Sequence, residues 1–375
     1  MKNNDFLLSL TKGLLSDSFK THRRNIEYIR FPASLVDKFK NSIKANILYF
    51  ASRWGWHRPA IVSNANLSFI LKNIDRFEEF YELLEDAPSK NLLIELLKFR
   101  ILGQRHVKLP LNNDEYQKNI RLIAGAVIKA DSIGRSGQLR INQYNWPVSN
   151  GKICLHANPL NIMNTFILEQ YAYRKAEVIE PEIGDVIIDG GACWGEASLY
   201  FADKVGSEGR VYGFEFDQTN LRTMRINCDL NEILNRRIKI VEKALWHESE
   251  RKIEYASMGP GTNILSRDYG AAVLSVNRKL FAETISIDDF VEREGISKID
   301  FIKMDIEGSE RNALRGAMKT LRAHRPKLAI SIYHLEDDFI QIPAFLNGLA
   351  LGYKFFIDHF TFYREETVLF AKCFA

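Results

Sequence analysis

Short apolar runs alternate with stretches of helical spacing from Gly184 onward. The apolar runs are rich in β-branched residues and bounded by glycine or acidic residues, as buried parallel strands are. Their alternation with helical stretches is typical of βαβ units around a parallel sheet. The pattern predicts an α/β fold, with a mostly parallel sheet and an antiparallel hairpin at its edge. The strands are expected at 185–189, 210–217, 237–245, 301–305, 327–334, 353–360 and 366–373.

The first 135 residues have a different pattern, in which apolar residues recur mainly at helical spacing. Helices are expected at 34–50, around Leu67 to Ile74, in the segment opened by Pro88, and at 116–130. We therefore predict a mainly helical N-terminal domain over 1–135. It contains no recognisable chemical motif. Substrate selection, oligomer contacts such as those of a homo-oligomer, and covering of a pocket all stay open as its role.

Residues 136–180 are expected to connect this domain to the α/β domain, which we place at 181–375. Alternating residues at 138–143 and 153–156 predict two short strands. Helical spacing then runs from about Asn161 to Ala176 and carries Tyr171 and Tyr173. Those tyrosines could lie across a pocket, although packing in the core is the more common use of such residues.

Composition narrows the class of protein. Of 375 residues, 46% are hydrophobic and 26% charged, as in an ordinary globular protein, and the length allows two domains. The net charge of +4 does not suggest a dedicated nucleic-acid binder, whose basic residues would be clustered. The four cysteines are scattered without metal-ligand spacing, and the apolar runs are too short for a membrane span or a signal peptide. We expect a cytoplasmic protein.

The turn after the first predicted strand is the main candidate for a binding site. It reads Asp189-Gly190-Gly191-Ala192-Cys193-Trp194-Gly195-Glu196 and leads into a helical stretch. Glycines let the backbone approach a ligand closely, and a strand, a glycine turn and a helix N-terminus form the cofactor cradle of doubly wound folds. The dinucleotide fingerprint G-x-G-x-x-G cannot be placed here. The turn resembles the class I methyltransferase loop acid-x-Gly-x-Gly-x-Gly, which wraps S-adenosylmethionine, with Cys193 at the middle glycine.

A second candidate is Glu215, which ends the next predicted strand about 20 residues beyond the glycines. In α/β folds an acid at this spacing holds ribose hydroxyls. The alternative is that Glu215 merely caps a strand end that faces solvent. Its pairing with the glycine turn favours the ribose contact.

Polar residues end four of the predicted strands: Asp189, Glu215, Asp305 and His334. Ligands of open α/β sheets bind outside the carboxyl ends of the strands, so these four side chains are expected at one crevice. Asp305 could instead cap a helix, and acids in the first turn of that helix could complement its dipole. His334 could serve as a general base towards a hydroxyl or be a structural histidine. Asp305 with Glu307 could also carry a divalent metal, which two carboxylates so spaced only weakly suggest.

Residues 165–375 resemble the FkbM family of S-adenosylmethionine-dependent methyltransferases. The most specific match is the segment from Ile299 to Ala317, which contains Lys303-Met304-Asp305-Ile306-Glu307-Gly308. The resemblance implies a Rossmann-like class I methyltransferase sheet. The other matching pieces are 186–195, 211–216, 284–290, 331–334 and 366–371.

The resemblance also implies an activity, namely methyl transfer to a hydroxyl of a sugar, glycan or secondary metabolite. A small molecule or glycan would be the acceptor, and His334 or Asp305 would act on its hydroxyl. The cofactor-binding residues would be Asp189, Gly190, Gly191, Ala192, Gly195, Glu196, Glu215, Phe216, Ala244 and Asp305. Two alternatives stay open: an NAD-linked oxidoreductase, which the missing fingerprint disfavours, and a non-catalytic binding protein on a methyltransferase scaffold.

Overall fold

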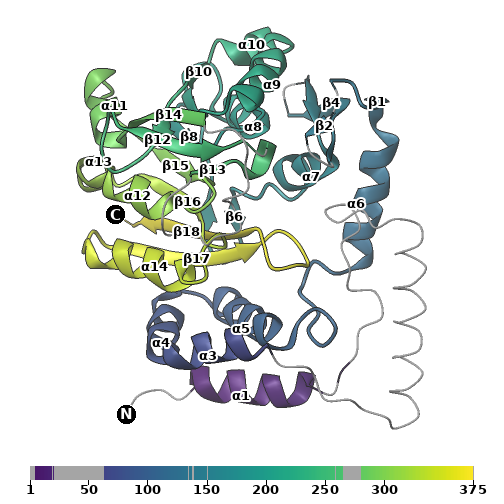
Figure 1. The fold of residues 1–375 in the computed structure, drawn as a ribbon, viewed down its shortest axis with the longest axis vertical. Coiled ribbons are helices and arrows are strands. Elements are labelled where there is room, and N and C mark those ends of the chain that lie inside the picture. Colours follow the sequence, from purple (N-terminus) through teal and green to yellow (C-terminus); the bar gives the residue numbers. More distant parts are fainter. Residues whose placement is uncertain are drawn as a thin grey trace. The chain divides into compact units, whose positions relative to one another are not determined.

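A computed structural model describes residues 5–18, 20, 63–133, 135–136, 139–149, 151–257, 259–264 and 280–374. The chain forms two compact units (Figure 1). One comprises Met1–Lys118 and Phe355–Thr367, and the other comprises Asn119–Lys354 and Val368–Ala375. The predicted helix at 34–50 lies outside the described residues, and the predicted domain limits at 135 and 180 stay predictions.

The second unit is built on the strands β10-β9-β8-β15-β16-β18, which are neighbours in one sheet in this order. The five strands from β10 to β16 run parallel, and β18 pairs antiparallel with β16. The predicted α/β fold, with a mainly parallel sheet and antiparallel strands at one edge, is therefore confirmed. The bounds are β8 Val186–Gly190, β9 Arg210–Phe214, β10 Ile238–Val241, β15 Phe301–Met304, β16 Lys327–Ser331, β17 Tyr353–His359 and β18 Thr367–Cys373.

The apolar side chains of the central strands are buried, as the unbroken apolar runs predict. Ile187 and Ile188 of β8 and Phe301 and Ile302 of β15 are fully buried. Because neighbouring parallel strands are in register, Lys303 of β15 lies opposite Asp189 of β8. Helices connect the strands, including α8 Glu196–Val205, α9 Gln218–Asp229, α11 Ile287–Arg293, α12 Glu310–Arg315, α13 Met318–His324 and α14 Asp338–Gly348 (Figure 1).

The strand predicted at 237–245 is in fact two strands in different sheets. β10 ends at Val241, and the backbone N–H of Lys243 turns back to the carbonyl of Val241 at 2.9 Å. The next two residues, β11 Ala244–Leu245, then pair with β14. The turn thus starts a smaller four-stranded sheet, β11-β14-β12-β13, with β12 Lys252–Ala256, β13 Asn263–Ile264 and β14 Leu280–Ile285.

Two predicted helices are shorter than expected. The helix predicted at 116–130 is α6 Asp114–Gly125, followed by β1 Val127–Lys129, which pairs with β4. The helix predicted at 161–176 is α7 Pro159–Ile162 and one π-helical turn at Met163–Ile167. It stops because Glu169 has a positive φ of 47°, a conformation that interrupts a right-handed helix. The strands predicted at 138–143 and 153–156 fall within β3 Leu139–Arg140, β4 Asn142–Val148 and β5 Gly151–Ala157.

The first unit is mainly helical, as predicted. In the part of this unit that the structure describes, the helices include α1 Asp5–Asp17, α3 Asn64–Lys72, α4 Ile74–Leu83 and α5 Ala87–Leu102. In α5 the Asp86 carboxylate accepts from the Ser89 N–H at 2.9 Å, and Gly103 with a φ of 77° ends the helix. Among the described residues, no helix is both long and apolar enough to cross a membrane.

Candidate functional site

The glycine turn after β8 passes very close to the end of β15. Gly191 has a φ of 78°, and a Cβ atom on it would lie 2.0 Å from the Asp305 carbonyl oxygen. The backbone N–H groups of Gly191 and Ala192 donate to the Phe214 carbonyl at 3.1 and 2.9 Å. Only glycine can occupy position 191, because any side chain would collide with backbone. The turn is thereby fixed between the carboxyl ends of β9 and β15.

A buried ion pair lies at the base of this turn. The Lys303 ammonium is 2.9 Å from Asp189 Oδ1, and it donates to the Gly191 carbonyl at 2.8 Å. Ser198 Oγ donates to the other carboxylate oxygen of Asp189 at 2.5 Å. Burial alone would lower the pKa of Lys303, but the nearby carboxylates of Asp189 and Asp305 raise it above its ordinary value. Lys303 is therefore a permanent cation, and Asp189 is engaged inside the protein.

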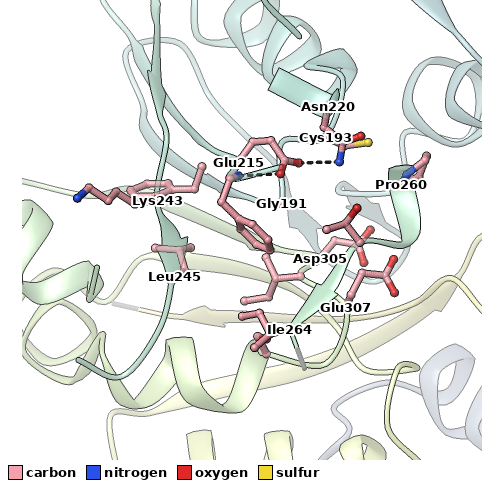
Figure 2. Close-up of a pocket in the computed structure, with 15 residues that line it drawn as sticks. Gly191, Cys193, Glu215, Asn220, Lys243, Leu245, Pro260, Ile264, Asp305 and Glu307 are labelled. Atoms are coloured by element: carbon pink, nitrogen blue, oxygen red, sulfur yellow. Dashed lines mark hydrogen bonds between the residues drawn. The ribbon is translucent and has the colours of Figure 1, made fainter. Parts of the chain in front are cut away.

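A pocket opens beside the turn at the carboxyl edge of the sheet (Figure 2). Its polar lining includes Glu215, Asn220, Asp305 and Glu307, and Phe216 adds an aromatic wall. Phe216 packs edge-to-face on Tyr255, with ring centroids 5.0 Å apart. Of the predicted cofactor and catalytic residues, Gly191, Glu215, Phe216 and Asp305 line this pocket, as do Cys193 of the glycine turn and Glu307, the possible metal ligand. The other predicted site residues are not part of the lining: Asp189, Gly190, Ala192, Gly195, Glu196, Ala244 and His334.

The Glu215 carboxylate is held by three donors. One oxygen accepts from the backbone N–H groups of Phe216 and Asp217 at 2.7 and 2.8 Å. The other accepts from Asn220 Nδ2 at 3.3 Å (Figure 2). Burial raises the pKa of Glu215 to about 7 in spite of these bonds. Asn220 also donates to the Gly259 carbonyl and accepts from the Trp194 indole, so it links the pocket to the glycine turn.

Glu196, the first residue of α8, is buried next to the turn. Asn161 Nδ2 donates to one of its carboxylate oxygens. Burial raises the pKa of Glu196 to about 7, and the carboxylates of Asp189 and Glu215 add to this effect. A carboxyl group with such a pKa is close to half-ionised at neutral pH.

Asp305, which directly follows β15, lies at the centre of a polar cluster. Tyr171 Oη donates to Asp305 Oδ2 at 2.8 Å, and Tyr333 Oη donates to Oδ1 at 3.1 Å. Burial would raise the pKa of Asp305, but the charges of His334 and Lys303 and these hydrogen bonds lower it. The carboxylate is thus ionised and oriented by two tyrosines.

His334 lies behind Asp305, away from the pocket lining. Its Nε2 is 3.3 Å from Asp305 Oδ1 and its Nδ1 is 3.0 Å from Glu310 Oε1. Burial would lower the pKa of His334, but the carboxylates of Glu310, Glu307 and Asp305 raise it well above its ordinary value. The raised pKa favours the protonated imidazole, which is a poor proton acceptor.

Several of these partners are not predicted from the sequence. Lys303 was detectable, because a lysine inside the apolar strand β15 has to find a counter-charge in the core. Tyr171, which the sequence suggested for the core or for the pocket, is buried and also bonds to Asp305. Asn220 and Glu310 had no local signal of this kind, because both lie in ordinary helical sequence.

Comparisons with known proteins fit this geometry. Residues 180–355 match the family model described as the methyltransferase FkbM domain. No curated protein sequence matches the chain.

Among solved structures, the chain is similar to methyltransferase FkbM from Methylobacillus flagellatus KT, with 22% identity and a TM-score of 0.50. That alignment covers 81% of this chain but 60% of the other, so this chain spans less than two thirds of its length. At this identity the likeness concerns the fold. Fibrillarin from Aeropyrum pernix, crystallised with S-adenosyl-L-methionine, has 12% identity, a TM-score of 0.36 and coverage of 64% of this chain and 85% of its own.

Proposed function

We propose that this chain, whose residues 180–355 belong to the FkbM methyltransferase family, is an S-adenosylmethionine-dependent O-methyltransferase. Its acceptor would be a hydroxyl of a sugar, a glycan or a secondary metabolite. The observation that carries the proposal is that Gly191, Glu215 and Asp305 line one pocket, although they follow three different strands. Such a pocket at the carboxyl edge of a parallel sheet is where α/β folds bind their ligands.

The residues present suit this cofactor. The turn at Gly191 leaves bare backbone facing the pocket, where a bulky ligand can approach. Glu215 has the hydrogen-bonding capacity for a ribose diol, and Phe216 with Leu245 and Ile264 offers apolar surface for a purine ring. When bound, S-adenosylmethionine supplies a methyl group on a sulfonium that is open to in-line displacement.

We assign the four other predicted cofactor residues that flank the pocket, Gly190, Ala192, Gly195 and Ala244, to shaping its backbone. Gly195, the N-cap residue of α8, has a φ of 83° and so lies in the left-handed region that glycine favours. Asp189 acts indirectly in this proposal, because Lys303 joins its carboxylate to the Gly191 carbonyl. Glu196 would act through the same turn.

For the acceptor, we assign Asp305 as the group that binds the hydroxyl, and His334 as a residue that positions Asp305. Asp305 lines the pocket, so its carboxylate can accept the hydrogen bond of an acceptor hydroxyl and take the proton as the oxygen attacks. His334 does not line the pocket, and its raised pKa makes it a poor proton acceptor, so it acts as a positioning residue. Much of the rate would come from holding the oxygen in line with the methyl group.

The four cysteines are free thiols, which supports a reducing compartment such as the cytoplasm.

The acceptor is proposed from the family alone, and a panel of sugars, glycans and hydroxylated metabolites is the means to find it.

Calorimetric titration with S-adenosylhomocysteine tests the cofactor assignment. We expect micromolar binding by the wild type and a loss of at least about tenfold in Glu215→Ala, because a hydrogen-bonded carboxylate is removed from the site. Glu242→Ala is the matched control, since Glu242 is half-exposed, pairs with Arg225 and does not line the pocket.

The same titration with NAD covers the alternative of an oxidoreductase. Binding of NAD without binding of S-adenosylhomocysteine would refute the proposed function. Tight S-adenosylhomocysteine binding together with no turnover on the whole acceptor panel would instead favour the non-catalytic binding protein.

A further inference from the structure

A group of ionisable side chains lies at the pocket edge, and we call Asp305, Glu307, Glu310 and His334 the His334 cluster. His334 Nδ1 is 3.0 Å from Glu310 Oε1, while Nε2 is 3.3 Å from Asp305 Oδ1 and 3.6 Å from Glu307 Oε2. Asp305 and Glu307 lie in the turn between β15 and α12, and Glu310 is the first residue of α12. His334 follows β16. Three carboxylates thus surround one imidazole in a largely buried space.

Glu310 is the least expected member of the cluster. Its side chain is 0% exposed. Its Oε1 accepts from the Ile306 N–H at 2.8 Å and faces the imidazole, but Oε2 is buried without a hydrogen-bond partner among the described residues. Leaving a charged oxygen buried and unpaired costs several kcal/mol, by order of magnitude. A carboxylate in this position calls for a cation that completes its bonding.

We propose that Asp305, Glu310 and His334 bind one divalent metal ion of the Mn²⁺ type. Each residue offers one ligand atom, and the three atoms lie within 4.8 Å of one another, as ligands around one ion do. Two carboxylate oxygens and one imidazole nitrogen suit Mn²⁺ and its first-row neighbours better than Ca²⁺, which takes oxygen ligands.

Surrounding groups hold the three ligands as metal ligands are usually held. Tyr171 and Tyr333 donate to the Asp305 carboxylate, and the backbone N–H of Ile306 donates to Glu310. Such outer hydrogen bonds orient the carboxylates that bind a metal. Asp338 faces the same cluster: its Oδ1 is 3.2 Å from Arg311 Nε, and burial together with the charge of Glu310 raises its pKa to about 7.

The competing occupant of the cluster is a proton on His334. A protonated imidazole also balances the carboxylates by its charge, although neither ring nitrogen has a hydrogen-bond partner among the described residues, and a metal ion would have to displace that proton. The two occupants differ in what they predict. If a proton occupies the cluster, the protein does not bind added metal there. If the cluster is a metal site, each chain binds one ion, and replacing a ligand residue weakens that binding.

The proposed ion would lie next to the pocket, because Asp305 and Glu307 are part of the lining (Figure 2). Three protein ligands leave coordination positions open for a water molecule or for a hydroxyl of a bound molecule. This consequence rests on the proposed function: in a methyltransferase, coordination would lower the pKa of the acceptor hydroxyl and so favour its attack. Binding of the ion itself does not depend on that activity.

Titration of the metal-free full chain with Mn²⁺, followed by calorimetry and by the electron paramagnetic resonance of free Mn²⁺, tests the proposal. We expect one ion per chain for the wild type and an affinity at least about tenfold weaker for Glu310→Gln and His334→Gln. Glu336→Gln is the matched control, because Glu336 is exposed and lies two residues from His334. Its affinity is expected to equal that of the wild type.

Folding of each variant is checked by circular dichroism, and His334→Gln decides the question if Glu310→Gln does not fold. Absence of Mn²⁺ binding by the wild type at millimolar concentration would overturn the proposal, as would equal affinities in all four proteins. S-adenosylhomocysteine is titrated into the same samples. Cofactor binding without Mn²⁺ binding would refute the metal site alone, and the reverse result would refute the proposed function alone.

Discussion

The Lys303 ammonium lies 2.9 Å from the Asp189 carboxylate, and both side chains are withdrawn from solvent between β15 and β8. The same ammonium donates to the Gly191 carbonyl and lies over the Tyr171 ring, 5.0 Å from its centroid. One buried cation therefore joins the central strands of the sheet to the turn that lines the pocket. The cost of burying it is offset by an ion pair and a hydrogen bond.

Replacing Lys303 by methionine is expected to destabilise the protein by about 3–5 kcal/mol, because Asp189 is left as an unpaired buried charge. S-adenosylhomocysteine affinity should fall at least about tenfold through loss of the bond to Gly191. Urea denaturation and calorimetry measure the two effects. In the double variant Lys303→Met with Asp189→Asn, we expect part of the stability to return. A double variant no more stable than Lys303→Met would contradict the ion-pair explanation, and exposed Lys298→Met serves as the control.

Gly191→Ala is expected to abolish cofactor binding. The new Cβ would lie 2.0 Å from the Asp305 carbonyl oxygen, and the φ of 78° adds strain for any residue with a side chain. Calorimetry with S-adenosylhomocysteine and a thermal melt would show lost binding with a lower melting temperature. Gly125→Ala is the control, because a Cβ there meets no atom within 4 Å. Wild-type affinity in Gly191→Ala would mean that the turn can move away from β15.

Asn220→Ala is expected to weaken S-adenosylhomocysteine binding about tenfold without touching the proposed ribose contact itself. Its amide donates to Glu215 and to the Gly259 carbonyl, and its oxygen accepts from the Trp194 indole at 3.0 Å. Losing these bonds frees the Glu215 carboxylate to adopt other orientations. Trp194→Phe removes only the indole bond and should have a smaller effect. If both variants bind as the wild type does, Asn220 does not position Glu215.

The stability of the unliganded protein is expected to fall as pH rises towards 8. Glu196 has a folded pKa of about 7 against an ordinary value of 4.5, so the native state holds a proton that the unfolded state has lost. The stabilisation is complete below about pH 4.5 and disappears as pH passes through 7. One such group contributes up to about 3 kcal/mol.

Glu196→Gln is the variant that isolates this effect, because it keeps the side-chain shape and an oxygen for the Asn161 amide. Urea denaturation at pH 5, 6, 7 and 8 should give a flatter dependence than in the wild type. Parallel curves for the two proteins would show that Glu196 does not titrate in this range. Glu215, whose pKa is also about 7, leaves a residual slope in the variant.

The local sequence predicted most of the parallel strands and two of the residues that line the pocket, although the strand predicted at 237–245 is two strands in different sheets. Burial imposes unbroken apolar runs on β8 and β15, and the glycine at 191 marks a backbone that approaches another strand. Since parallel strands end at a common edge, the sequence placed Glu215 and Asp305 at one pocket without knowledge of their distance. The expected α/β fold followed from the same periodicity.

The pairings within the site were decided by the tertiary structure. Asp189 was expected to face the cofactor, yet strand order sets it beside Lys303, which lies far along the chain. From its sequence position His334 was a candidate general base, but the structure surrounds its imidazole with three carboxylates from the segment after β15, which raise its pKa. A side chain's protonation and hydrogen bonds depend on neighbours that only the packing of the strands and helices brings together, and no local pattern encodes those neighbours.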